Sequence, residues 1–375
     1  MIYLDNNATT EPLPPVRAVM MEYLTENWGN PSSAHTFGLK AKAGIDRARS
    51  TVAALVGAES DQVVFTGSAT EANNTAILSA LRASPLKHRI VASSTEHSAV
   101  ITMGRAQESS GHELVLLPPL ASGIVDISAL SNAINSDTAL VSIMWANNET
   151  GVINPIAEIA ALCRQRGVLF HCDAVQAAGK LPIDLRAIPV DYLTVSAHKI
   201  HGPKGVGALI VAPHAPFTPM LYGGHQENGR RGGTENIPAV MGFAKATNLA
   251  AAELSHRAQH VAMLRDRLES RILAEVPGTG VNGLGAPRLS NTTNIGFAGI
   301  DSDTLVSLLD QRGVCVSSGS ACLSDAVAPS HVILAMTGSY QKASEAIRFS
   351  LSHLNTEAEI EQAIEAVKQA VGCLR

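Results

Sequence analysis

The sequence predicts an α/β fold with a mainly parallel seven-stranded sheet, helices on both of its faces, and a smaller α+β domain. Helical stretches such as ATEANNTAILSALRA and PIAEIAALCRQRG lie between several apolar segments, as the crossovers of parallel strands require. The pattern changes after residue 291, where shorter strands and helices alternate. The strand candidates between residues 60 and 212 are QVVFT, RIVASS, ELVLL, ALVSIMWA, VLFHCD, DYLTVSAH and VGALIV.

The second half of the chain predicts how the two domains are joined. Helical apolar spacing continues from about residue 236 to 275 and carries the chain into the smaller domain. That domain combines the strands NTTNIGFA, GVCVSS and AIRFSLS with the helices DSDTLVSLLDQRG and TEAEIEQAIEAVKQAVG. We find no internal repeat and no low-complexity tract.

The composition is that of a globular protein with a small ligand. Of the 375 residues 46% are hydrophobic and 16% charged, enough for a large core. The net charge of −5 and the absence of long basic runs argue against nucleic acid or an anionic membrane as a partner. The first residues, MIYLDNNATT, do not form a secretory signal, and no segment suits a membrane span. We therefore expect a cytoplasmic protein.

Five cysteines occur without any CxxC pair, so the sequence predicts neither a disulfide framework nor a thiolate zinc site. Cys163 lies in a predicted helix, and Cys172 and Cys315 lie in predicted strands, where a packing role is the default. Cys322 differs, because it lies in SSGSACL among small polar residues. We therefore expect an exposed and reactive thiol at Cys322.

Two strands end in residues suited to chemistry. Asp173 closes the strand FHCD, with Gln176 three residues later, and for the aspartate taken alone helix capping is the slightly favoured explanation. The strand before SAHKIHGPKG leads into Ser196, His198 and Lys199. A lysine at a buried strand end is costly unless it is used, for example as a Schiff base. The alternatives are a solvated loop lysine or a metal site at His198 and His201, which lacks a nearby third ligand.

A third strand is followed by TGSATEANN, where a helix begins. The unpaired amides of a helix start, with the Thr70 hydroxyl, suit a phosphate, although ordinary capping by Ser68 or Thr70 explains the same residues. Together the three motifs supply what pyridoxal 5′-phosphate needs: a phosphate anchor, a carboxylate for its ring nitrogen and a Schiff-base lysine.

The sequence also resembles the NifS/IscS-type (group I) cysteine desulfurases of the class V aminotransferase family over residues 2 to the C-terminus. The shared motifs occur in the family's order, and the lysine motif and the cysteine loop both fit although more than a hundred residues separate them. They are YLDNNATT, NPSSAH, ATEANN, EHSAV, MWANNETG, HCDAVQAAGK, SAHKIHGPKGVG, GGHQENGRRGGTEN, SSGSAC and IRFSLS.

The resemblance implies a fold-type I pyridoxal phosphate enzyme, a homodimer, that converts L-cysteine to L-alanine and leaves sulfur as an enzyme persulfide. We expect a large cofactor-binding domain over residues 15–252, and a small domain over 1–14 and 253–375 that carries the nucleophile loop. An iron-sulfur scaffold or another protein would accept the sulfur. The short C-terminus resembles the NifS side of the family.

The resemblance also assigns roles to single residues. Lys199, His97 and Cys322 would be catalytic: Lys199 holds the cofactor and moves protons, His97 stacks on its ring, and the Cys322 thiolate attacks the substrate sulfur. Arg348 would bind the substrate carboxylate beside Asn148. The other cofactor contacts would be Asp173 at the ring nitrogen, Gln176 at the phenolic oxygen, and Ala69, Thr70, Ser196 and His198 at the phosphate, with Thr234 from the other subunit.

The chain departs from its relatives after the nucleophile, where it reads CLSDAVAPSHV. Leu323 and Ala328 bear on recognition of the sulfur acceptor and leave the chemistry unaffected. Three alternatives stay open at this point. They are a selenocysteine or cystine lyase with the same cofactor, a metal-dependent hydrolase, and a non-catalytic protein that keeps the fold.

Overall fold

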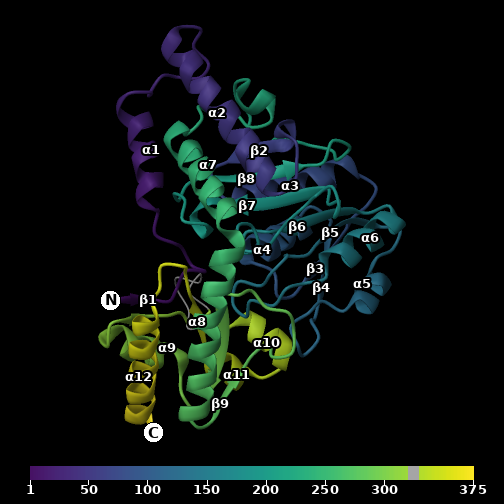
Figure 1. Ribbon diagram of the computed structural model, residues 1–375. Coiled ribbons are helices and arrows are strands. Elements are labelled where there is room, and N and C mark those ends of the chain that lie inside the picture. The colour runs from purple at the N-terminus through teal and green to yellow at the C-terminus, as the bar shows by residue number, and fades with distance from the viewer. Residues whose placement is uncertain (320–328) are drawn as a thin grey trace.

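The large sheet forms as the sequence predicts. The computed structural model describes residues 1–319 and 329–375 (Figure 1). The sheet has seven strands in the order β2-β8-β7-β6-β5-β3-β4. Strand β8 pairs antiparallel with β2 and β7, and the remaining pairs are parallel. The strands are β2 (Val63–Thr66), β3 (Arg89–Ser93), β4 (Glu113–Leu117), β5 (Thr138–Ser142), β6 (Leu169–Asp173), β7 (Tyr192–Ser196) and β8 (Gly207–Val211).

Helices cover both faces of this sheet because successive strand residues point to opposite sides. Val63 and Phe65 pack into one core with helices α2 (Thr36–Leu55), α6 (Ile156–Arg166) and α7 (Ile237–Ala252), whereas Val64 packs with α3 (Ala69–Ala83) and α4 (Ser98–Glu108). Helix α1 (Pro14–Thr25) lies against α7, and α5 (Ile127–Ala133) contacts α6 and β4. Both faces are therefore buried, as a mainly parallel sheet requires.

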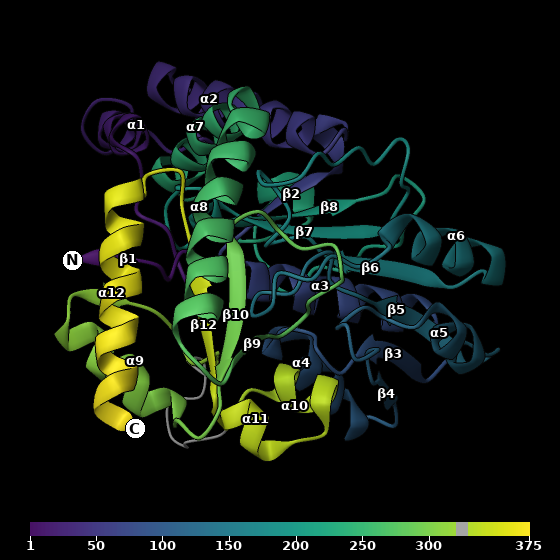
Figure 2. The ribbon, with the colours of Figure 1, turned by 60° about the horizontal axis from the view of Figure 1, so that its bottom comes forward.

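The remaining elements form a second, smaller core (Figure 2). Helices α8 (Leu254–Glu275) and α12 (Glu357–Leu374) pack together with apolar residues spaced by three or four, which places them on one face of each helix. A three-stranded antiparallel sheet and a parallel strand pair complete it. Its other elements are β1 (Ile2–Tyr3), β9 (Thr279–Val281), β10 (Thr292–Phe297), β11 (Val314–Cys315), β12 (Ala346–Ser350) and α9 (Ser302–Gln311).

The N-terminal segment joins the two cores. Strand β1 pairs with β11, and the chain then passes β12 before it reaches α1. Short helices α10 (His331–Thr337) and α11 (Tyr340–Ser344) pack on one another near β12. Of the helices in the described ranges, none is both long and apolar enough to cross a membrane.

The structure differs from the sequence prediction in the bounds of several elements. The helical run over 236–275 is two helices, since Glu253 (φ −119°, ψ 12°) interrupts it. The predicted strand over 139–146 ends at Ser142, and Ala146 makes only an isolated bridge to Ile153. An apolar pattern that continues through a backbone turn does not reveal the turn, so these element ends cannot be predicted from it.

Candidate active site

A cavity of about 300 Å³ lies beyond the carboxyl ends of β6 and β7, the place where sheets of this kind bind ligands. Chain segments from both cores line it. Most of the residues that the sequence singled out meet there: Ala69, Thr70, His97, Asn148, Asp173, Gln176, His198, Lys199 and Arg348.

Asp173 is the last residue of β6 and is buried. Its Oδ1 accepts a hydrogen bond from the Val175 amide at 3.0 Å, and its Oδ2 accepts one from Asn73 Nδ2 at 2.8 Å. The Oδ1 of Asn73 is buried and, among the described residues, has no hydrogen-bond partner. The carboxylate is thus held firmly on the cavity wall, next to an acceptor without a donor.

Lys199 ends the single 3₁₀ turn Ala197–Lys199 that follows β7. Its Nζ donates to the carbonyl oxygen of Asn7 at 2.6 Å and to that of Ala8 at 2.7 Å. The N-terminal segment therefore positions the lysine that the sequence proposed as the cofactor anchor.

Two histidines line the cavity in surroundings that favour their neutral form. Burial lowers the pKa of His97, an effect that nearby Asp173 opposes, and Nδ1 of His97 accepts from the Ala99 amide at 3.1 Å. The remaining proton of the neutral ring is therefore on Nε2. Burial and the neighbouring Lys199 lower the pKa of His198 to about 4, and its Nδ1 lies 3.2 Å from Thr9 Oγ1.

The start of α3 forms another part of the wall. Ser68 caps the helix, with its Oγ accepting from the Glu71 amide at 3.1 Å, while the Glu71 carboxylate accepts from the Gly67 amide at 2.8 Å. Ala69 and Thr70 stand at the helix N-terminus, where amides lack intrahelical acceptors. A Cβ on Gly207 of β8 would lie 3.0 Å from the Ala69 nitrogen, so glycine permits this close approach.

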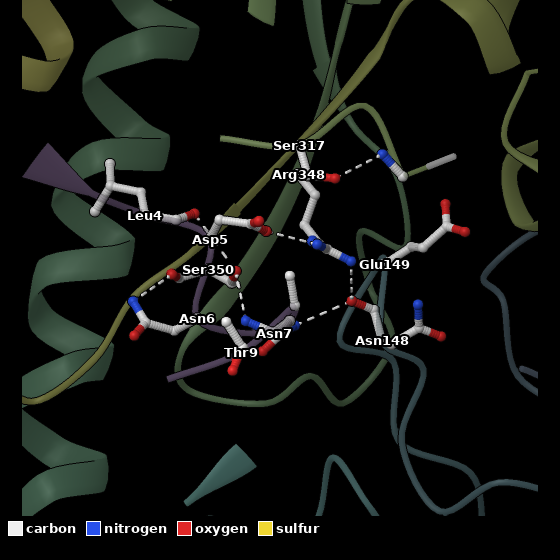
Figure 3. A network of polar contacts seen from close by, with 12 residues as sticks. Leu4, Asp5, Asn6, Asn7, Thr9, Asn148, Glu149, Ser317, Arg348 and Ser350 are labelled. Carbon is white, nitrogen blue, oxygen red and sulfur yellow. Dashed lines mark hydrogen bonds and ion pairs between the residues drawn. The ribbon is translucent and has the colours of Figure 1, made fainter. Parts of the chain in front are cut away.

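Arg348 of β12 reaches the cavity from the smaller core and is buried (Figure 3). Its Nη2 pairs with Asp5 Oδ1 at 2.6 Å, and its Nη1 donates to the carbonyl oxygen of Asn148 at 3.2 Å. Its Nε has no partner among the described residues. A buried guanidinium with one unsatisfied donor is a candidate partner for an anion.

Other predicted residues lie elsewhere. Ser196 is buried at the end of β7, and Thr234 lines a separate cavity of about 230 Å³ with Glu227 and Arg231. Cys322 lies outside the described residues, and its role as the nucleophile stays a prediction. Gly319, which precedes the undescribed stretch, lines the main cavity.

Three of the described cysteines, Cys163, Cys172 and Cys315, are unsuited to nucleophilic chemistry. Burial raises the pKa of Cys163 to about 12 and the pKa of Cys172 well above its usual value. Partial burial and the neighbouring Asp310 raise the pKa of Cys315. A high pKa keeps a thiol protonated and unreactive.

Sequence reasoning missed several residues that build this site, namely Asp5, Asn7, Asn73 and Lys180. Asn7 Nδ2 donates to the Asn148 carbonyl at 3.0 Å and to Thr292 Oγ1 at 2.8 Å, so it ties both cores together. The motifs YLDNNATT and HCDAVQAAGK contained three of these residues, but nothing local shows which partners distant segments bring.

The fold and the site define an α/β enzyme that has a lysine, an aspartate and a helix N-terminus around one cavity at the sheet edge. The Aminotransferase class-V family model matches residues 2–363, and the chain belongs to this family. The described ranges contain no group of three or more His, Cys, Asp and Glu side chains that could hold a metal ion.

Two curated relatives that are similar to this chain over its whole length are cysteine desulfurases. The chain is 46% identical to a cysteine desulfurase of Nostoc sp., with 100% of this chain and 94% of that protein covered. It is 44% identical to the cysteine desulfurase NifS of Azotobacter vinelandii, covering 100% and 93%.

Solved structures of similar proteins superpose on nearly the whole chain. A NifS-like protein superposes with a TM-score of 0.93 at 35% identity, covering 99% of both chains. SspA in complex with cysteine superposes with a TM-score of 0.82 at 32% identity, covering 95% of this chain and 100% of that one.

Proposed function

We propose that the protein is a pyridoxal 5′-phosphate-dependent cysteine desulfurase that converts L-cysteine to L-alanine and passes the sulfur to its own Cys322. The observation that carries this function is the meeting of Lys199, Asp173 and Arg348 in one cavity. Cysteine desulfurases that are 46% and 44% identical over the whole chain, the second of them named NifS, support the same reaction.

The residues present fit this cofactor. Lys199 would hold it covalently, Asp173 would bind the ring nitrogen, and the donor-deficient Oδ1 of Asn73 lies on the same wall. When bound, the cofactor withdraws electrons from the Cα of an attached amino acid. The phosphate would lie at the α3 N-terminus on Ala69 and Thr70, with His198 beside it and Ser196 and the partner subunit's Thr234 as further donors.

Proton transfer would fall to two groups. Neutral His97 lines the cavity with its proton on Nε2, and Lys199, which lines the same cavity, would remove and return a proton at the substrate Cα. Gln176 would donate from its amide nitrogen to the phenolic oxygen of the cofactor.

The substrate carboxylate would bind at the open edge of Arg348, beside Asn148. Asp5 already occupies Nη2, so the carboxylate meets Nε or displaces Asp5. The substrate carboxylate would then point to the smaller core, and Gly319 would line the cavity beside the substrate.

In the sulfur-transfer step the Cys322 thiolate attacks the substrate sulfur. A sulfur–sulfur bond forms, the Cβ–S bond of the substrate breaks with its electron pair passing to Cβ, and Cβ takes up a proton equivalent to the one that the substrate thiol gives up. The products are alanine and a persulfide on Cys322. A dithiol or a second thiolate then takes the terminal sulfur, and we propose an iron-sulfur scaffold protein or another sulfur acceptor for this role.

The test is incubation of the purified protein with L-cysteine and a thiol reductant, with alanine, sulfide and the visible spectrum followed together. We expect equal release of both products, abolished by Lys199→Ala and by Cys322→Ser. A cofactor spectrum without sulfide would overturn the desulfurase function. Higher rates on selenocysteine or cystine than on L-cysteine would favour the related lyase.

We also propose a homodimer in which Thr234 completes the cofactor site of the other subunit. Its position in a separate cavity supports this, since it does not reach the main cavity of its own chain.

We propose domains over 15–252 and over 1–14 with 253–375, supported by the separate hydrophobic cores. The unpaired thiols of the described cysteines support a cytoplasmic location.

A further inference from the structure

Lys180 is a lysine of the protein interior that the reaction described above does not use. It lies four residues after Gln176, in the turn that follows β6, and is partly buried. The turn is pinned by close packing, because a Cβ on Gly179 (φ +71°) would lie 2.7 Å from Ile200 Cγ2. The backbone from which the Lys180 side chain extends is therefore held in place close to the cofactor cavity.

The Lys180 ammonium determines how the Gln176 amide is oriented. Lys180 Nζ donates to Gln176 Oε1 at 2.7 Å, while Gln176 Nε2 donates to the Asn7 carbonyl at 3.0 Å. An ammonium only donates and a carbonyl only accepts, so a flipped amide would lose both bonds. The second N–H of Nε2 is then available to an acceptor in the cavity that Gln176 lines.

The same ammonium is linked to Lys199 through one residue. Lys180 Nζ lies 3.3 Å from Asn7 Oδ1, and Lys199 Nζ lies 2.6 Å from Asn7 O. Asn291 Nδ2 also donates to Asn7 Oδ1, at 3.0 Å. The two lysines therefore hold opposite ends of Asn7, and any shift of Lys180 is passed to the backbone that positions Lys199.

We propose that Lys180 is a positioning residue for the cofactor site, which orients Gln176 toward the phenolic oxygen and places a positive charge behind Lys199. The inference rests on the proposed cofactor and deepens the proposed function. The oxygens that Lys180 contacts are neutral amides, so its charge acts on the site without a directly bonded carboxylate.

The electrostatic surroundings set the pH below which Lys180 is charged. Burial, then the charges of Lys199 and Arg348, lower the pKa of Lys180 to about 7. The titratable or charged groups that face the small cavity beside it are Lys199, His201, Arg257 and His353. In return, a charged Lys180 disfavours a proton on the nitrogen of Lys199, so its removal should make that nitrogen easier to protonate.

The experiment compares Lys180→Met, which removes charge and donor, with Lys180→Gln, which keeps a neutral donor. Lys204→Met is the matched control, because this nearby lysine is exposed. The measurements are the affinity of the apoprotein for pyridoxal 5′-phosphate and the pH midpoint of the visible absorption of the bound cofactor, without substrate.

We expect Lys180→Met to weaken cofactor binding about tenfold and to raise the pH midpoint by about half a unit or more. Lys180→Gln should recover most of the affinity but keep the raised midpoint, and Lys204→Met should change neither. Wild-type affinity and midpoint in a folded Lys180→Met protein would overturn the proposal. If that variant does not fold, an unshifted midpoint in Lys180→Gln overturns it.

These outcomes are separate from those for the proposed function. Neither measurement uses L-cysteine, so a protein that binds the cofactor but releases no sulfide would overturn the desulfurase function alone. A wild-type protein that binds no cofactor would overturn both.

Discussion

At the scale of single residues, the site depends on polar side chains whose partners come from distant segments. Arg348 is the clearest case, since Asp5 and the Asn148 carbonyl fix two of its nitrogens, and the third has no partner among the described residues. A planar guanidinium held in this way recognises a carboxylate by geometry as well as by charge.

Arg348→Lys should therefore reduce kcat/KM for L-cysteine by about tenfold to a hundredfold, mainly through KM, because one charge-assisted hydrogen bond and the fork geometry are lost. Steady-state kinetics check this. The matched control is Arg288→Lys, whose pair with Glu269 lies in the smaller core away from the cavity. An unchanged KM in Arg348→Lys would show that the carboxylate binds elsewhere.

The sequence predicted much of this site at residue scale, but not all of it. Lys199, Asp173 and Thr70 could be found because each ends or follows a strand and belongs to a residue type with a chemical role. Asp5, Asn7 and Lys180 could not, since their importance comes from tertiary contacts between residues more than 150 positions apart.

At the scale of elements, the sheet edge is shaped by backbone proximity. Strand β8 runs antiparallel to β2 and β7, and Gly207 at its start lies against the first residue of α3. The amides at this helix start can bind phosphate only if β8 and α3 stay this close.

Gly207→Ala should weaken binding of pyridoxal 5′-phosphate about tenfold or more, because its Cβ would lie 2.9 Å from the Val195 carbonyl oxygen and 3.0 Å from the Ala69 nitrogen. Equilibrium titration of the apoprotein measures this. Gly280→Ala on β9 is the control, since a Cβ there meets nothing within 4 Å. Equal cofactor affinity in the two variants would refute this account of the phosphate site.

Prediction from sequence succeeded for elements in proportion to their apolar signal. All seven strands of the large sheet were found, because buried strands are short apolar runs. Strands β1 and β11 are each two residues long, which is too short for an apolar pattern to predict where they begin and end. Their pairing also joins segments more than 300 residues apart. The break at Glu253 was missed because the apolar spacing continues on both sides of it.

At the scale of the whole molecule, buried neutral histidines couple stability to pH. His171 is fully buried in the sheet, and Ser142 and Thr194 bond to its ring. Burial lowers its pKa from 6.5 to about 4. In the unfolded chain the ring takes up a proton below pH 6.5, whereas in the folded chain it does so only near pH 4, so acid favours unfolding across that interval.

The free energy of unfolding should fall as the pH is lowered from 7 to 4, and His171 alone accounts for up to about 3 kcal/mol of that loss. Urea unfolding at several pH values checks this. His171→Gln should lower stability at pH 7 but flatten the dependence, whereas a variant of the exposed His256 should keep the wild-type slope. An unaltered slope in His171→Gln would contradict the assignment.

The central claim, sulfur transfer from L-cysteine to Cys322, is tested most directly by one turnover without reductant. The measurement is mass spectrometry of the peptide that contains Cys322, with alanine counted in the same sample. We predict one additional sulfur atom on Cys322 and one alanine per subunit. Alanine formed without that sulfur, or with the sulfur on another cysteine, would contradict the account.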